Sequence, residues 1–221
     1  VSNKEGLSGV VDKDGKEVEL TEKDGKYTFT MPASKVIVKA SFKKITEVNP
    51  FADVKSSDYF YDAVLWAVES DITKGTSATT FSPNESCTRG QIVTFLWRAA
   101  GSPETKNVAN FSDIATDAYY AKAVAWAVEN GITMGTSETT FSPDATCTRA
   151  QAVTFLSRAL KGKASVENAF SDVAANSYYA EAVAWAVANS IAYGTTETTF
   201  SPDEVCTRGQ IVTFMFRAMV E

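Results

Sequence analysis

Apolar residues between residues 59 and 70 recur at the spacing of one face of an α-helix. Tyr61, Val64 and Val68 stand at positions i, i+3 and i+7, which predicts an amphipathic helix near 59–70. A turn rich in Gly, Thr, Ser and Pro follows over 75–83, and its Gly and Pro residues interrupt regular structure. Within this turn we expect Phe81 to fill the core.

A second helix is predicted to begin after Thr88. Thr88 and Gln91 have the spacing of a capping box, and Cys87 and Ile92 have the spacing of a hydrophobic staple. The apolar stripe of this helix then consists of Ile92, Phe95, Leu96 and Ala99.

The same pair of helices is repeated three times along the chain. The opening Phe-x-Asp begins at residues 51, 111 and 170, and the distances from Phe to Trp and from Trp to Cys are identical in every copy. A helix pair of about 50 residues buries little apolar surface alone, so we expect the copies to pack on one another. The recurring residues are Trp66, Trp126 and Trp185, Cys87, Cys147 and Cys206, and Arg89, Arg149 and Arg208.

Residues 1–45 have a different pattern. Asp14-Gly15 and Asp24-Gly25 are turn signals, and apolar and polar residues alternate beside them, at 18–20, 27–31 and 36–42. This pattern predicts a small antiparallel β segment of two or three strands.

Composition excludes several kinds of protein. The 221 residues include no His, which removes His-based catalysis and His-ligated metals, and the net charge of −6 without a basic run argues against nucleic acid as a partner. No apolar stretch approaches the ~20 residues that cross a bilayer, so no membrane insertion is expected. The first residues are polar and lack Met, which suggests an internal fragment with further domains upstream.

The cysteines and the repeated aspartates each have two interpretations. Three thiolates could converge on a metal, but as staple residues the cysteines need only be small and apolar, and we favour this structural role. Glycosidase chemistry needs two inequivalent carboxyl groups, whereas one Asp recurs alone in each copy, so a cap or turn role is favoured. We therefore predict no enzyme activity, no metal and no cofactor. The aspartates are Asp53, Asp113 and Asp172.

The repeated unit resembles the S-layer homology (SLH) domain. The resemblance rests on the Phe-x-Asp-Val opening, the Ala-Val-x-Trp-Ala-Val helix, the Gly-x-x-x-x-Thr-Phe-x-Pro turn and the Thr-Arg start of the second helix. It implies a mainly α fold, in which three helix-loop-helix repeats form a pseudo-threefold assembly, with units at 46–104, 105–164 and 165–221. Residues 27–34, in the segment 1–45, resemble the end of divergent internalin B-type β-repeats.

The SLH resemblance also implies a function and a site. In that family the domains anchor exported proteins to secondary polysaccharides of bacterial cell walls, often through pyruvate-ketal sugars, so an extracellular location at the wall or S-layer is expected. The family's anion-contacting Arg maps onto Arg89, Arg149 and Arg208. A competing hypothesis is a structural or protein-interaction module that assembles or spaces a surface layer.

Local chemistry supports an anion site and leaves alternatives open. An Arg in the first turn of a helix is unfavourable unless something negative neutralises it, and a carboxylate held by a two-pronged guanidinium would do so. An internal ion pair with Asp53 or Glu85 is the alternative. Lys74 could assist an anion or be a plain surface residue. The family motif has Glu at the capping position, where this chain has Gln91, Gln151 and Gln210. The tryptophans could stack on sugars or fill the core; they are Trp66, Trp126 and Trp185.

Overall fold

The computed structural model describes residues 9–12, 14, 16–19, 21–23, 26–28, 30, 36–39, 49–106, 110–164 and 170–220. The chain divides into two compact units, Val1–Val48 and Asn49–Glu221. Each unit is described by itself.

The first unit contains short antiparallel strands. Strand β1 (Gly9–Asp12) lies between β2 (Glu17–Val18) and β5 (Val36–Lys39), with Val10 opposite both Val18 and Val38. Strands β3 (Thr21–Lys23) and β4 (Lys26–Thr28) form a separate pair. The predicted turn at 24–25 and most of the 27–34 segment lie outside the described residues.

The second unit contains two helices in each copy, as the sequence predicts. The first helices are short, and the second helices are slightly longer. Their bounds are α1 (Tyr61–Glu69), α2 (Arg89–Ala99), α3 (Ala121–Glu129), α4 (Arg149–Leu160), α5 (Ala180–Ala188) and α6 (Arg208–Met219).

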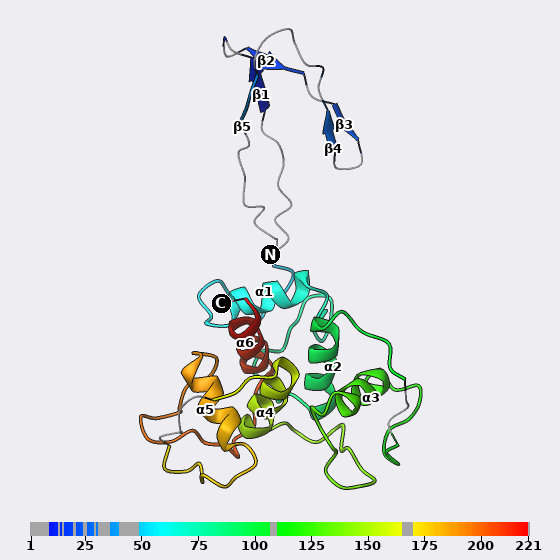
Figure 1. The fold of residues 1–221 in the computed structure, drawn as a ribbon, viewed down its shortest axis with the longest axis vertical. Helices are drawn as coiled ribbons and strands as arrows, with labels where there is room; N and C mark the ends of the chain where they lie inside the picture. The colour runs from blue at the N-terminus through cyan, green and yellow to red at the C-terminus, as the bar shows by residue number, and fades with distance from the viewer. Residues whose placement is uncertain are drawn as a thin grey trace. The chain divides into compact units, whose positions relative to one another are not determined.

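The helices pair between copies. The first helix of each copy packs on the second helix of the preceding one, in the pairs α2–α3 and α4–α5, and α1 closes the circle on α6. Figure 1 shows α2, α4 and α6 in the middle of this unit, with α1, α3 and α5 around them. The expected packing of the copies on one another is confirmed. The first helix of each copy packs against the second helix of another copy, which we call the exchange of helix partners.

A ring of three backbone hydrogen bonds lies where the copies meet. The N–H of Cys87 donates to the carbonyl of Cys206 at 2.9 Å, that of Cys147 to Cys87 at 2.8 Å, and that of Cys206 to Cys147 at 2.9 Å. Isolated antiparallel bridges flank the ring, including Thr88 with Thr146. Each copy therefore donates to one neighbour and accepts from the other, and the ring closes without an unpaired edge.

The start of each second helix and the end of each first helix are fixed by local sequence. Each second helix begins with the predicted capping box: at α2 the N–H of Gln91 donates to Thr88 Oγ1, and the N–H of Thr88 donates to Gln91 Oε1. Each first helix ends in a left-handed residue, Asp71 in α1, after which Ile72 N–H donates to Ala67 O. This Schellman arrangement places buried Ile72 beside buried Ala67 and turns the chain toward the core.

The repeated aspartates hold the turn before each second helix. Asp53 accepts hydrogen bonds from the N–H groups of Phe81 and Ser82, at 2.9 and 2.7 Å, and Asp113 and Asp172 do the same in their own copies. Ser82 adopts φ +57°, a left-handed conformation that these two bonds stabilise. The predicted turn role is confirmed, and Phe81 is fully buried as expected.

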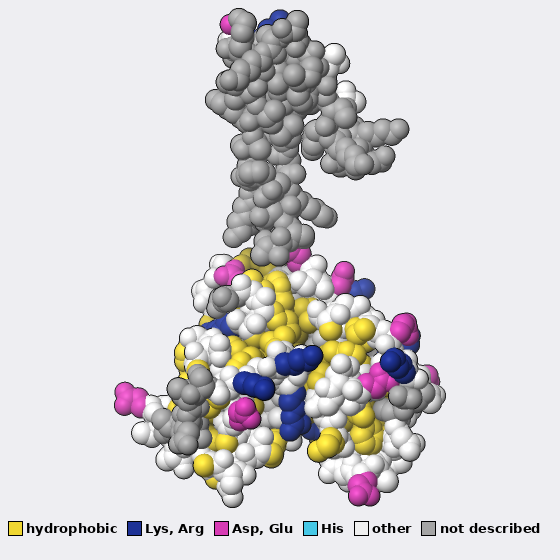
Figure 2. Space-filling view, viewed as in Figure 1, with side chains coloured by type: hydrophobic (Ala, Val, Ile, Leu, Met, Phe, Trp, Pro, Cys, Tyr) yellow, Lys and Arg dark blue, Asp and Glu magenta, His cyan; other side chains and the backbone are white. Residues whose placement is uncertain are grey.

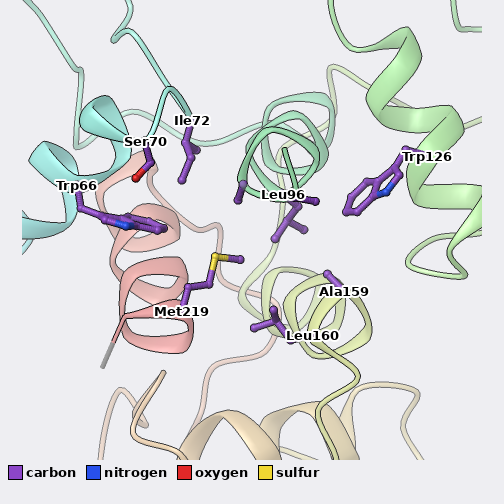
Figure 3. A pocket seen from close by; sticks show the side chains of 10 residues that line it. Trp66, Ser70, Ile72, Leu96, Trp126, Ala159, Leu160 and Met219 are labelled. Atoms are coloured by element: carbon purple, nitrogen blue, oxygen red, sulfur yellow. The ribbon is translucent and has the colours of Figure 1, made fainter. Parts of the chain in front are cut away.

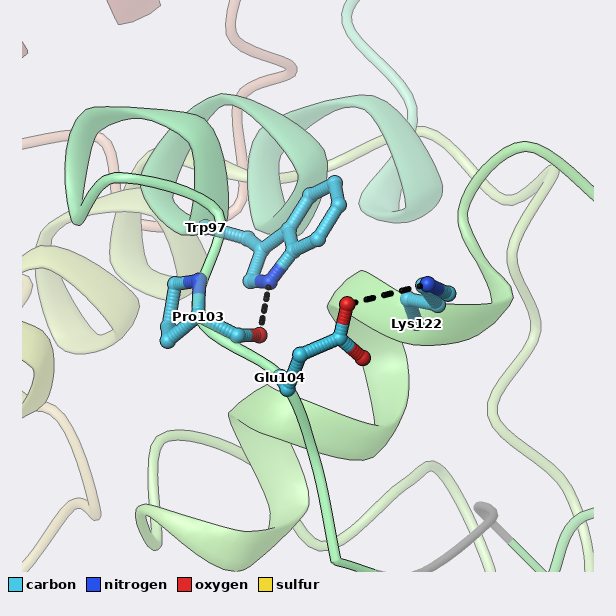
Figure 4. Close-up of polar contacts among 4 residues, drawn as sticks. All are labelled: Trp97, Pro103, Glu104 and Lys122. Atoms are coloured by element: carbon cyan, nitrogen blue, oxygen red, sulfur yellow. Dashed lines mark hydrogen bonds and ion pairs between the residues drawn. The ribbon is translucent and has the colours of Figure 1, made fainter.

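The link between copies 1 and 2 is also fixed by side chains. Trp97 of α2 donates from Nε1 to the carbonyl of Pro103 at 2.9 Å, and Lys122 of α3 reaches Glu104 at 3.4 Å (Figure 4). The ion pair is exposed and contributes little to stability. The tryptophan bond, in contrast, holds the linker against α2.

We predict that Asp172→Asn destabilises the fold in a pH-dependent way. Burial opposes ionisation of Asp172, but hydrogen bonds from Phe200 and Ser201 outweigh it and lower its pKa. Because the folded pKa lies below the unfolded one, the stabilisation is complete above the unfolded pKa and is lost as pH falls through the folded pKa. At pH 7 the variant should lose about 1–3 kcal/mol.

Denaturant unfolding of both proteins between pH 7 and pH 3 measures this. The difference in unfolding free energy should shrink as the pH falls below about 4. A difference of constant size across that range would show that the charge of Asp172 does not contribute.

Candidate functional site

Three arginines occupy the first position of the second helices and lie almost wholly inside the protein. Arg89, Arg149 and Arg208 are 4%, 5% and 3% exposed. The backbone N–H of Arg89 donates to Ala145 O of copy 2, and the next residue, Gly90, donates to Pro143 O. Each helix therefore begins against the turn of the following copy, and this carries the arginine into the boundary between copies.

Each guanidinium is held by the next copy in the same way. Nε donates to the carbonyl of the buried turn phenylalanine at 2.9–3.0 Å, and Cζ lies over that ring at 4.6–4.8 Å and over a helix phenylalanine at 5.3–5.9 Å. We name the three places by their arginines. The Arg89 site uses Phe141 and Phe155, the Arg149 site uses Phe200 and Phe214, and the Arg208 site uses Phe81 and Phe95.

Among the described residues, no carboxylate oxygen lies within 4 Å of these guanidinium groups, so the alternative of an internal ion pair is not formed. Asp113 acts electrostatically on Arg89, and Glu85 and Asp53 act on Arg208, from a greater distance. Asp53 and its equivalents bind turn N–H groups instead, and the ion pair found there joins Lys122 and Glu104. Burial lowers the pKa of Arg89 and of Arg208, which reflects the cost of enclosing each cation. The positive end of a helix macrodipole adds to this cost. An anion at the site would offset both effects.

An exposed tyrosine from the third copy lies within electrostatic range of each arginine. Tyr178 lies near Arg89, Tyr119 near Arg208 and Tyr59 near Arg149. These side chains are 59–64% exposed, and each packs edge-on against the aromatic residue that follows it. Burial raises the pKa of all three phenols, so they remain neutral hydroxyl donors at neutral pH.

These tyrosines were not among the site residues predicted from the sequence. The signal was present as an aromatic pair directly before each first helix: Tyr59-Phe60, Tyr119-Tyr120 and Tyr178-Tyr179. The second member caps the helix and packs inward, which leaves the first without a structural requirement for an aromatic ring. An exposed aromatic residue in all three copies is a typical sugar-stacking candidate.

The three glutamines lie beside the arginines but are used by the backbone. Gln91, Gln151 and Gln210 each accept a hydrogen bond from the cap threonine N–H at 3.0–3.4 Å. All three are partly buried. Their side-chain oxygens therefore stabilise the helix start that presents the arginine.

The tryptophans are not brought together with the arginines. Trp126 and Trp185 are 9% and 7% exposed and belong to the core, while Trp66 is partly buried and packs edge-on against Phe216. Trp66 and Trp126 line an apolar pocket of about 380 Å³ with Ala99 of α2 (Figure 3). Ala99 follows Arg89 by ten residues, about 15 Å along the helix.

Lys74 lies in the turn of copy 1 that receives Arg208. Its side chain is exposed, and the equivalent residues are Met134 in copy 2 and Tyr193 in copy 3. Because the carbonyl of the equivalent Tyr193 accepts a hydrogen bond from Arg149, Lys74 stands at the corresponding position of the turn that receives Arg208. The Arg89 and Arg149 sites have no cation at this position. Figure 2 shows basic side chains near the middle of one face of the domain, among exposed hydrophobic ones.

The cysteines lie in the ring of backbone hydrogen bonds. All three are fully buried and unpaired by disulfides, and burial raises the pKa of Cys87 and of Cys206 to about 12. Within residues 49–106, 110–164 and 170–220, no group of His, Cys, Asp and Glu is arranged to hold a metal ion. The described helices also include none that could cross a membrane.

Comparison with known proteins accounts for this arrangement. The S-layer homology domain family matches residues 50–93, 110–153 and 169–212, which together make up more than half of the chain. The chain belongs to the S-layer homology (SLH) domain family. Each SLH match begins at the turn-binding Phe-x-Asp segment and ends inside the second helix, so it includes one arginine of the site.

Curated relatives agree with this assignment. The chain is 32% identical over 168 residues to an endoglucanase of Bacillus sp. (strain KSM-635), covering 73% of the chain and 18% of that protein. It is 30% identical over 187 residues to a surface-layer 125 kDa protein of Lysinibacillus sphaericus, covering 82% and 15%. A cell surface protein of Thermoanaerobacter kivui is 32% identical over 116 residues, covering 50% and 15%.

Membership in the SLH family indicates a place at the bacterial cell surface or cell wall and a role in anchoring to it. SLH domains bind cell-wall polymers in general. The chain spans less than a fifth of the length of the relatives that it matches.

We predict that the three thiols of the folded protein do not react with Ellman's reagent at pH 8. Full burial and pKa values of about 12 at Cys87 and Cys206 keep the thiolate fraction very small. In guanidinium chloride all three should react within minutes. Rapid reaction of even one thiol in the folded state would contradict the buried ring.

Proposed function

We propose that this chain is a non-catalytic wall anchor that binds an acidic secondary polysaccharide of the bacterial cell wall, through sites between SLH repeats. The observation that carries the proposal is a buried guanidinium without a carboxylate partner, repeated at Arg89, Arg149 and Arg208. A charged group enclosed in this way is unfavourable unless it is paired, and a ligand carboxylate would pair it.

The ligand class follows from the chemistry around the guanidinium. A helix N-terminus and an arginine favour an anion, and an exposed neutral tyrosine favours the face of a sugar ring. A carboxylate carried on a sugar, such as a pyruvate ketal, satisfies both. Because Nε already donates to a phenylalanine carbonyl, the contact would use the terminal nitrogens of the guanidinium.

The threefold repetition of the site matches the repetitive structure of the proposed ligand. Wall polysaccharides are repetitive polymers, and several modest sites on one anchor raise the overall affinity by holding neighbouring units of one chain. In this proposal Gln91, Gln151 and Gln210 fix the helix starts and Lys74 adds positive charge to the Arg208 site. Trp66, Trp126 and Trp185 support the repeats from within and lie away from the ligand.

The proposal extends to the organisation of the chain. We infer that units 46–104, 105–164 and 165–221 act together as the anchor, and that residues 1–45 are the end of a β-repeat of the divergent internalin B type. Further domains of the parent protein would then precede the anchor. Relatives that include an endoglucanase and a surface-layer protein are compatible with an anchor that serves different partners.

We predict that replacing Tyr59, Tyr119 and Tyr178 by Ala weakens binding to sacculi of Lysinibacillus sphaericus about tenfold or more, while the melting temperature changes little. The rings are mostly exposed, so their removal opens no cavity, but stacking on sugars is lost. Val128→Ala, an exposed apolar residue on α3, is the control and should bind like the wild type.

Co-sedimentation with sacculi, before and after acid removal of their polysaccharide, measures this binding. Wild-type protein should sediment only with the intact sacculi. Equal sedimentation with stripped sacculi, or full binding by the triple tyrosine variant, would favour the alternative of a lattice or spacer module.

A further inference from the structure

The three arginine sites differ at one atom, the Nη2 nitrogen. In the Arg149 site, Nη2 donates to the carbonyl of Tyr193 at 2.7 Å. In the Arg89 and Arg208 sites, the same atom is buried and has no hydrogen-bond partner among the described residues. Both of these side chains are more than nine-tenths buried. An unpartnered buried donor on a cation is costly, so two of the three sites lack an acceptor that the third already has.

The backbone of copy 3 is held where it supplies that acceptor. In every copy an arginine of the second helix donates to the carbonyl two residues before this position: Arg98 to Ile72, Arg158 to Ile132 and Arg217 to Ile191. Copy 3 adds a ring contact, because the Tyr193 ring lies 5.2 Å from Arg217 Cζ. Met134 and Lys74 stand at the equivalent position of copies 2 and 1, and both have exposed side chains.

A second difference separates the same two sites from the third. The residue after the arginine is Gly90 in α2 and Gly209 in α6, but Ala150 in α4. A Cβ at Gly90 would lie 3.1 Å from both Pro143 O and the Tyr120 ring, and one at Gly209 would lie 3.0 Å from the Phe60 ring. The Arg89 and Arg208 sites therefore share a close approach of an aromatic ring to the helix start.

Resting on the proposed function, we infer that carboxylate binding is confined to the Arg89 and Arg208 sites, and that Arg149 is a structural residue whose site is closed by the Tyr193 carbonyl. A ligand carboxylate oxygen supplies the acceptor that Nη2 lacks in the two open sites. In the Arg149 site it would have to displace a charge-assisted hydrogen bond that the chain makes by itself.

The two open sites also differ from each other. The Arg208 site has Lys74 at the position where the Arg89 site has Met134. The additional cation should make the Arg208 site the tighter of the two for an anion at low ionic strength, and added salt should reduce this advantage because Lys74 is exposed.

The test is calorimetric titration of the whole chain with short oligosaccharides cut from the polysaccharide of Lysinibacillus sphaericus sacculi. A second sample of the oligosaccharides, with carboxyl groups reduced to alcohols, serves as the uncharged control. The wild type should bind two carboxylated equivalents and no reduced ones. Arg89→Gln and Arg208→Gln should each leave one equivalent, while Arg149→Gln should keep two, bind within about twofold of the wild type and melt at a lower temperature.

The outcomes separate this inference from the proposed function. No binding of either oligosaccharide by the wild type would overturn the proposed function itself. Binding of three equivalents, or of one, would overturn the inference alone, and so would an Arg149→Gln variant that loses an equivalent. The wild-type stoichiometry decides between two and three sites even where Arg149→Gln does not fold. If the unpartnered Nη2 atoms bind only water, the carboxylated and the carboxyl-reduced oligosaccharides should bind with equal affinity. That result would also overturn the inference.

Discussion

The closed ring of backbone hydrogen bonds through Cys87, Cys147 and Cys206 is the constraint on which the rest of this domain depends. Each N–H must find a carbonyl in a different copy, so three copies satisfy one another and fewer leave a buried donor and acceptor unpaired. The fully buried cysteines stand at this point because a small apolar side chain lets three backbones approach closely. The exchange of helix partners, with α1 returning to α6, follows from the same closure.

The arginine sites are a consequence of that closure. The residue two positions after each cysteine is the arginine, so the ring that joins the backbones also places each guanidinium against the turn of the next copy. A site then consists of an arginine from one copy, a phenylalanine carbonyl from the second and a tyrosine from the third. No copy contains a complete site, and binding in the proposed function therefore depends on the assembled trimer of repeats.

Sequence reasoning predicted what depends on local order. The helix near 59–70, the capping box at Thr88 and Gln91, the buried Phe81 and the turn role of Asp53 are all written within one copy, and the structure confirms them. Periodicity shows which face of a helix is buried but not which helix covers it, so the exchange of partners could not be predicted. The tyrosines were missed because the arginine that each one lies near belongs to another copy. The difference between Arg149 and its two equivalents depends on a backbone carbonyl, which no side-chain pattern reveals.

Native-state hydrogen exchange at the amides of Cys87, Cys147 and Cys206 measures whether the ring opens only when the whole domain unfolds. If the ring holds the three repeats as one unit, these amides should open only in global unfolding, with one common free energy equal to that from denaturant unfolding of the domain. Exchange of any one of them by a local opening at a clearly lower free energy would show that the copies separate individually and that the ring does not hold them as one unit.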